Sequence, residues 1–304
     1  MSQRHAIFPL TMSQSPWANL ALVFFLVALG AFLGQLMAVM LYALGTDDNM
    51  AAAIHASLLP KRWLLMLQAI TASSAFIAAP LVYLQIFTQQ GSRTLFQWRQ
   101  SYVAPMLMTL GLVLAFMVVD AWLIQWNKAI RLPTWLSAFE VWAQAKEASL
   151  QRTTALLTSF DSLTELGIGI VVMGIIPAIG EELLFRGLVQ NLCHKLTSNI
   201  HPAIGISAFV FSAIHLQFYG FLPRFLLGIL FGYMYWWTKD LLFPMVAHLF
   251  NNTCVLLMFF LHQRELITQD ISALPMPPKP VLIFFATVGL TLANLLRQQG
   301  KRAY

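Results

Sequence analysis

Charged side chains are scarce in this sequence of 304 residues, because only 10% are Asp, Glu, Lys or Arg while 59% are hydrophobic. A soluble domain of this length would carry roughly a quarter charged residues. The mean hydropathy of +0.70 points the same way. We therefore exclude a soluble protein and expect lipid to solvate the outer faces of the helices.

Cysteine is also nearly absent, since the chain contains two, Cys193 and Cys254. Both lie in or beside apolar helical sequence, so we interpret them as small buried hydrophobes and not as a disulfide framework or a CxxC metal site. The net charge of +6 is modest and fits contacts with anionic lipid headgroups. The sequence has no basic stripe with interleaved aromatic residues, so we expect no nucleic-acid partner.

Two common signatures of hydrolases are missing as well. The sequence contains no HExxH, which excludes a zincin, and no GxSxG, and it shows no clear nucleophile beside a base. A cleavable signal peptide is not expected, because the first apolar run, 18–45, is far longer than the roughly 7–15 residues of a signal peptide's apolar region.

Apolar runs long enough to cross a bilayer make up most of the chain. They are joined by short polar turns, apart from a longer and more polar connector at 127–162. The expected spans are 18–45, 63–88, 103–126, 164–196, 201–218, 222–238, 241–262 and 280–297. We therefore predict an all-α fold, a polytopic transmembrane helical bundle of about eight spans that forms a single membrane domain over 1–304.

The connector and the short loops give further expectations. Its end, ALLTSFDSLTELG at 155–167, could form an interfacial helix that leads into the fourth span, which could bend at Pro177. Lysine and arginine in the short loops favour both termini on the cytoplasmic side. Short loops without targeting sequence fit an integral, multi-pass protein of a bacterial inner membrane.

Ionisable side chains within spans are costly, and they mark functional sites by default. Here they form three clusters on three spans: EELLFR at 181–186, FSAIH at 211–215 and HLFNN at 248–252. The third span adds one acid, Asp120, which could pair with a polar group of the core. The second half of the chain therefore holds nearly all of the buried polar chemistry.

In the first cluster the two glutamates point in different directions. Glu182 and Arg186 are four residues apart and share a helix face, so they can form an ion pair. Glu181 lies about 100° around the helix and is left to face a cavity, which suits a general base. A purely structural network of the three residues is the alternative.

The other two clusters also allow more than one interpretation. His215, one turn above Phe211, could equally be a hydrogen-bonded core residue or a functional one. His248 and Asn252 share a face, so they could hold a metal, donate two hydrogen bonds to an oxyanion, or connect helices. Together the three clusters supply the groups needed to activate water and hydrolyse an acyl bond.

These three motifs, in this order on successive spans, resemble the EExxxR, FxxxH and HxxxN pattern of the CPBP family of intramembrane proteases. This family is also called the CAAX-protease or Abi family, and it includes relatives of the Ras-converting CAAX endopeptidase. The resemblance covers about 160–260, which we take as the catalytic core. It implies an endopeptidase of the membrane that acts on a peptide or protein substrate, which could be lipidated.

The resemblance also implies roles for single residues. Glu181 would activate the attacking water with help from His215, while His248 and Asn252 would stabilise the oxyanion. The residues implied in support are Glu182, Arg186 and Phe211. The family has been described as metalloprotease-like and as glutamate-dependent. Glu181, His215 and His248 could therefore bind Zn²⁺ with a water position left open, or do acid–base work directly.

Two functions from other classes fit the same sequence. Bacterial members of the family include immunity proteins, so the chain could be a non-catalytic binding protein of the same fold. A proton-coupled transporter would also use buried Glu, His and Arg side chains. The two halves of the chain show no matching pair of broken helices, which argues against the transporter.

Overall fold

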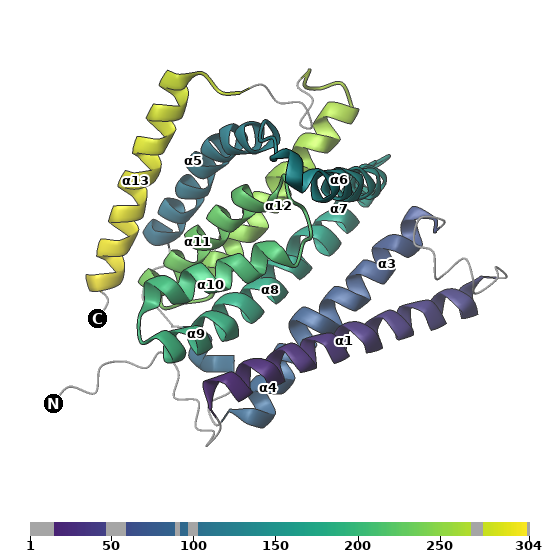
Figure 1. The fold of residues 1–304 in the computed structure, drawn as a ribbon, viewed down its shortest axis with the longest axis horizontal. Coiled ribbons are helices and arrows are strands. Elements are labelled where there is room, and N and C mark those ends of the chain that lie inside the picture. Colours follow the sequence, from purple (N-terminus) through teal and green to yellow (C-terminus); the bar gives the residue numbers. More distant parts are fainter. Residues whose placement is uncertain (1–14, 47–58, 89–91, 97–102, 269–275, 303–304) are drawn as a thin grey trace.

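The computed structural model describes residues 15–46, 59–88, 92–96, 103–268 and 276–302. These ranges are largely helical, and no strand occurs within them. The α-helices are α1 (Pro16–Gly45), α3 (Lys61–Ala72), α4 (Ala79–Phe87), α5 (Val103–Lys128), α6 (Ser137–Leu157), α7 (Leu163–Gly169), α8 (Ile176–Glu182), α9 (Gln190–Thr197), α10 (Ile200–Ala213), α11 (Phe221–Thr238), α12 (Leu242–Gln263) and α13 (Lys279–Arg302). Figure 1 shows α8 to α12 in the middle of the bundle, with α5 and α13 on one side and α1, α3 and α4 on the other.

Six helices in the described ranges are long and apolar enough to cross a membrane. They are Pro16–Gly45, Lys61–Phe87, Val103–Lys128, Leu163–Thr197, Leu242–Gln263 and Lys279–Lys301. The helical membrane bundle is thus confirmed, with six such helices in place of about eight. Helix α10 has 14 residues and reaches only about 21 Å, less than the ~30 Å of a bilayer core. Helix α11 has 18 residues, but Arg224 and the run YMYWWT reduce its hydropathy.

The span Leu163–Thr197 is not a uniform α-helix. Two π-helical segments interrupt it, Ile170–Ile175 before α8 and Leu183–Val189 after it. Pro177 lies in the first turn of α8, directly after the first of these segments, where its missing N–H is tolerated. Every residue of Leu183–Val189 is buried. Since π-turns are frequent at functional sites, this segment is the first structural indication of where such a site lies.

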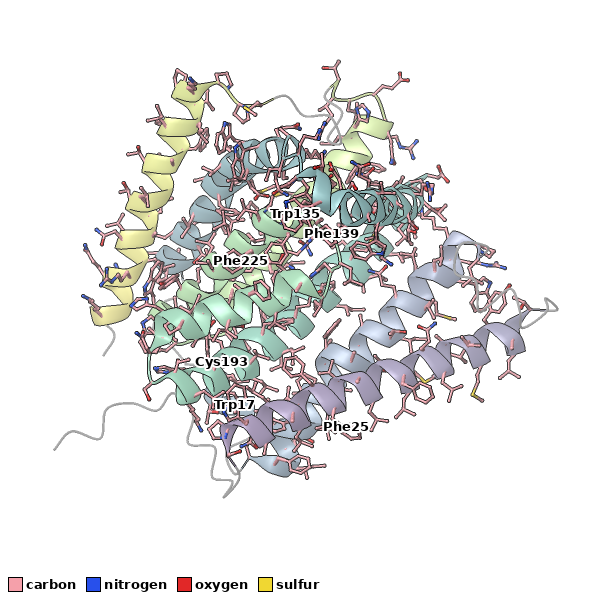
Figure 2. The ribbon with its side chains drawn as sticks, in the orientation of Figure 1. Trp17, Phe25, Trp135, Phe139, Cys193 and Phe225 are labelled. Atoms are coloured by element: carbon pink, nitrogen blue, oxygen red, sulfur yellow. The ribbon has the colours of Figure 1, made fainter. Side chains whose placement is uncertain are left out.

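The connector between α5 and α7 differs from the expected arrangement. The predicted interfacial helix at 155–167 is wrong, because α6 ends at Leu157 and α7 begins at Leu163. The reason is a helix start signal: the Ser162 hydroxyl accepts a hydrogen bond of 3.2 Å from the Glu165 N–H. The surface helix of the connector is α6 itself, and Figure 2 shows Trp135 and Phe139 at its N-terminal end.

Candidate active site

A buried ion pair forms the centre of the site. Arg186 Nη1 lies 2.8 Å from Glu182 Oε1, and the two side chains are 1% and 0% exposed. The predicted pair is therefore confirmed. Arg186 Nη2 also donates to the carbonyl of Gly228 at 2.9 Å. The guanidinium carbon lies over the Phe211 ring, 4.8 Å from its centroid, and over the Phe231 ring, 5.4 Å from its centroid, so two aromatic rings contact the cation.

Glu182 does more than neutralise Arg186. Its Oε1 atom also lies 2.8 Å from His248 Nδ1, so one carboxylate oxygen binds the arginine of one helix and the histidine of another. A His248 ring that donates its Nδ1–H to this carboxylate presents Nε2 on its opposite edge. The sequence predicted only the pair with Arg186 and missed this contact, because helix periodicity relates residues of one helix only.

Glu181 takes a different direction from Glu182. Its Oε2 atom lies 3.9 Å from His248 Nε2, and its side chain is 12% exposed against 0% for Glu182. This separation is longer than a hydrogen bond, so the two atoms do not bind each other directly. The structure thus places Glu181 on the more accessible edge of His248 and Glu182 on the buried edge.

His215 lies just beyond the end of α10, near the same aromatic ring. Its Nδ1 atom is 2.8 Å from the carbonyl oxygen of Phe211, which holds the ring through Nδ1 and leaves Nε2 without a hydrogen-bond partner among the described residues. The Phe211 ring centroid is 5.3 Å from that of His215 and 6.3 Å from that of His248. Phe211 therefore brings the two histidines and Arg186 together, although the described residues show no hydrogen bond between His215 and Glu181 or His248.

Asn252 is held by the backbone of another helix. Its Nδ2 atom donates to the Met173 carbonyl at 3.0 Å, within the π-helical segment Ile170–Ile175. Its side-chain oxygen accepts from Asn251 Nδ2 at 3.3 Å. An amide nitrogen has two hydrogens, so one donor of Asn252 is left for another partner. The structure thus ties Asn252 to the span that also carries Glu181, at a carbonyl that precedes Glu181 along that span.

The three candidate zinc ligands are not assembled as a metal site. In the part of the chain that the structure describes, no group of three His, Cys, Asp or Glu side chains could hold a metal ion. The Nδ1 edge of His248 is occupied by Glu182, and Nδ1 of His215 is occupied by the Phe211 carbonyl. A zinc ion would therefore have to use the two Nε2 atoms and Glu181. A metal requirement therefore stays a prediction, which the zinc content of the purified protein tests.

Polar side chains that sequence reasoning missed stabilise the π-turn that carries Arg186. Asn191 Nδ2 donates to the carbonyls of Arg186 and Gly187 at 3.1 and 2.8 Å. Ser207 Oγ, from α10, donates to the Phe185 carbonyl at 2.9 Å. A π-turn disturbs the regular backbone ladder, and these side chains supply donors there. A buried asparagine in an apolar span was the available signal.

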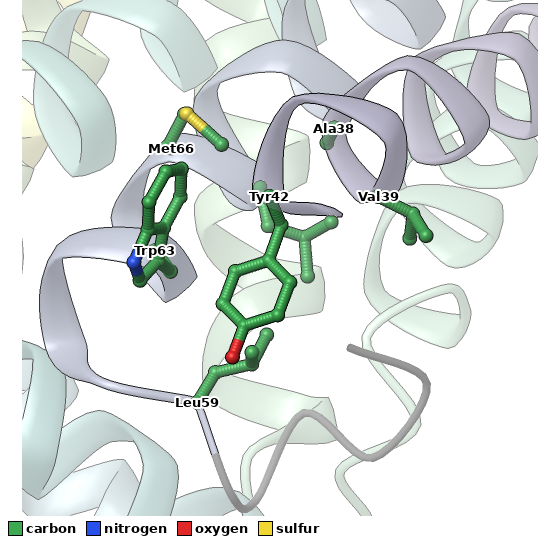
Figure 3. A pocket seen from close by; sticks show the side chains of 7 residues that line it. Ala38, Val39, Tyr42, Leu59, Trp63 and Met66 are labelled. Atoms are coloured by element: carbon green, nitrogen blue, oxygen red, sulfur yellow. The ribbon is translucent and has the colours of Figure 1, made fainter. Parts of the chain in front are cut away.

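An apolar cavity lies away from this site. It is between α1 and α3 and is lined by residues that include Tyr42, Leu59, Trp63 and Met66 (Figure 3). None of the three motifs contributes a lining residue. The cavity is therefore separate from the candidate active site.

Comparison with known proteins points to the same part of the chain. Residues 164–254 match the family model described as "Type II CAAX prenyl endopeptidase Rce1-like". The "Putative membrane peptidase YdiL" of Bacillus subtilis (strain 168) is 28% identical over 120 residues, which are 40% of this chain and 48% of that protein. The "Uncharacterized protein YpbD" of the same bacterium is 30% identical over 83 residues, which are 26% of this chain and 39% of that protein.

The matched segment runs from α7 into α12 and contains all three motifs. The chain spans about half the length, or less, of the curated relatives that it matches. No solved structure matches it. The resemblance to the CAAX-protease family, first drawn from three short motifs, is confirmed by this family match over residues 164–254.

Proposed function

We propose that this protein is an intramembrane endopeptidase in which Glu181 activates the water that attacks a peptide bond. The observation that carries the proposal is the position of His248 between two glutamates. Glu182 Oε1 lies 2.8 Å from Nδ1, and Glu181 Oε2 lies 3.9 Å from Nε2. A water molecule that hydrogen-bonds to both Glu181 and Nε2 can span a gap of this length.

The proposed steps use only these side chains. Glu181 takes a proton from the water, and the resulting hydroxide attacks the carbonyl carbon of the scissile bond. The second N–H of Asn252, and Nε2 of His248 when it carries a proton, donate to the oxyanion. The oxyanion then collapses to a carboxyl group, the carbon–nitrogen bond breaks, and the proton held by Glu181 passes to the leaving amine. His215 Nε2 assists the water, and Glu182 with Arg186 fixes the orientation of His248.

The first test compares matched acid variants of the purified, full-length protein. Glu181→Gln is expected to lower peptide cleavage by roughly 100-fold or more, because a general base typically contributes 10²–10⁴-fold. Glu165→Gln is the control, since Glu165 lies at the start of the same span and binds Lys61. Full cleavage activity in Glu181→Gln would contradict the proposal. If a function in the host cell survives this variant, the non-catalytic binding protein becomes the better interpretation.

Metal content decides between the two chemistries that the sequence leaves open. Elemental mass spectrometry would measure zinc in the wild-type protein, in Glu181→Ala and in His248→Ala. About one zinc per chain, lost in both variants, would identify these residues as ligands and the protein as a metallopeptidase. Cleavage by metal-free wild-type protein would leave Glu181 as a direct general base.

We also propose that both termini lie in the cytoplasm of a bacterium. The six candidate spans in the described ranges are an even number, which would place the termini on one side, and both relatives named above come from Bacillus subtilis. The basic residues of the short loops favour the cytoplasmic side. A fluorescent protein fused after the last residue should fluoresce, whereas alkaline phosphatase fused there should be inactive; the reverse result would contradict this orientation.

A further inference from the structure

A second arginine lies near the candidate active site without a carboxylate bound to it. Arg224, in the first turn of α11, is partly buried. It donates to the Gln217 side chain and to the Gly220 carbonyl. None of the ion pairs among the described residues includes it. A guanidinium has five N–H donors, so these two bonds leave three donors without a partner among the residues that the structure describes.

The position of Arg224 connects it with the site. Both of its partners belong to 214–220, the turn between α10 and α11 that also carries His215. Ser212 Oγ closes this turn by donating to the Phe221 carbonyl at 2.7 Å. Arg224 interacts electrostatically with both Glu181 and His215, so it lies within charge range of the candidate catalytic groups but not in contact with them.

Two further acids near Arg224 are also incompletely satisfied. Asp120 on α5 and Glu147 on α6 both interact electrostatically with Arg224. Each has one buried carboxyl oxygen without a hydrogen-bond partner, Asp120 Oδ1 and Glu147 Oε2. Burial raises the pKa of Glu147, and the positive charge of Arg224 acts against this shift. The region thus combines unused cationic donors with unused acceptors.

A peptide end can satisfy both kinds of group at once. Its carboxylate would bind the free donors of Arg224 in the paired geometry that guanidinium and carboxylate groups favour. Its backbone N–H groups would donate to the orphaned oxygens of Asp120 and Glu147. We propose that Arg224 binds a carboxylate of the peptide substrate and so sets which bond reaches Glu181. This inference rests on the proposed function, and it adds the part of the substrate that is recognised.

The carboxylate could come from the C-terminus or from an acidic side chain, and three peptides separate these sources. The first is a fluorescent S-farnesyl peptide that ends in Cys-Val-Ile-Ala with a free carboxylate. The second is its C-terminal amide, and the third is the amide with Asp in place of Ala. Binding to the full-length Glu181→Gln protein in liposomes is measured by anisotropy, and cleavage by wild-type protein is measured in parallel.

We expect the free acid to bind roughly 10- to 100-fold more tightly than the plain amide, as for a hydrogen bond to a charged group. Adding Arg224→Gln should remove this preference by weakening only the acid peptide, and Arg224→Lys should restore part of it. Arg131→Gln is the matched control, because within the described ranges Arg131 hydrogen-bonds only to the nearby carbonyls of Lys128 and Ile130. Tight binding of the third peptide would support the same contact with a side-chain carboxylate.

Two results would overturn the inference. The first is equal affinity for the acid and the amide peptide. The second is an equal loss of affinity for both peptides in the Arg224→Gln variant. The parallel assay keeps the two proposals apart: an acid preference in binding without cleavage by wild-type protein would contradict the proposed function alone. If the acid and amide peptides bound equally well and were cleaved at equal rates, the role of Arg224 would be contradicted while the proposed function would stand.

Discussion

Two spans of this protein have similar hydropathy and opposite surroundings. The span Leu163–Thr197 has a mean hydropathy of 2.0, and half of its most apolar stretch is buried inside the protein. The span Lys279–Lys301 has a mean hydropathy of 1.7, but only 6% of its most apolar stretch is buried. Helix α13 turns Ile283, Phe284 and Leu290 outward, with exposures between 61% and 73%. Hydropathy therefore identifies a span but does not tell whether lipid or protein surrounds it.

Buried polar residues indicate which span is surrounded by protein. The buried span contains Glu182, Arg186, Gln190 and Asn191, each at most 5% exposed, and each has a hydrogen-bond partner on its own or a neighbouring helix. Polar groups cannot face hydrocarbon without large cost, so their presence predicts which side of a span is covered by protein. The predictions below compare the buried region around Leu163–Thr197 with α13.

The largest effect is expected from Glu182→Gln. This change leaves the buried Arg186 charge without its carboxylate and weakens the bond to His248. Breaking a buried ion pair by removing one partner typically costs about 3–5 kcal/mol. Thermal unfolding in detergent should show a clear fall in midpoint together with lost cleavage.

Glu181→Gln is the matched control for this experiment. Glu181 forms no direct hydrogen bond to His248, so its variant should unfold near the wild-type temperature while losing cleavage. Equal destabilisation by both variants would mean that the two glutamates belong to one structural network, which was the alternative left open by the sequence.

Paired glycines give the next comparison. A Cβ at Gly228 on α11 would lie 3.0 Å from Ala208 Cβ and 3.2 Å from Phe211 Cδ1, whereas at Gly289 on α13 the nearest atom is Ala115 Cβ at 3.5 Å. Gly228→Ala should destabilise by about 1–3 kcal/mol through overpacking and displace the carbonyl that binds Arg186. Gly289→Ala should be neutral or slightly stabilising. Thermal unfolding of both variants checks this, and a tolerated Gly228→Ala would contradict the close packing.

A paired asparagine experiment tests the π-turn. Asn191→Ala removes the donor to the Arg186 and Gly187 carbonyls and should cost about 1–3 kcal/mol, the typical penalty for buried groups left unsatisfied. Asn294, exposed on α13, is the control, and Asn294→Ala should change little. Hydrogen exchange of the 183–189 amides should rise only in the first variant. Unchanged exchange would show that Asn191 does not stabilise this segment.

The sequence predicted the helical bundle and the Glu182–Arg186 pair because both depend on local pattern. Apolar length gives spans, and a spacing of four gives a shared helix face. The contact between Glu182 and His248 joins residues 66 apart, and no periodicity relates them. The π-turns, and the open donors of Arg224, likewise depend on how helices pack. The span count differed because α10 and α11 are apolar in sequence but shorter or less apolar than a spanning helix.

The smallest effect is expected at the rim of the buried span. Lys61 Nζ lies 2.7 Å from Glu165 Oε2, and the two side chains are 19% and 39% exposed, so water and salt screen the pair. Glu165→Gln should shift the unfolding midpoint only slightly at low salt, and not at all at high salt. Glu182→Gln should keep its effect at both salt concentrations, because water does not reach that pair. If high salt removed both effects equally, the Glu182–Arg186 pair would be open to solvent, and the contrast between the buried region and the rest of the bundle would fail.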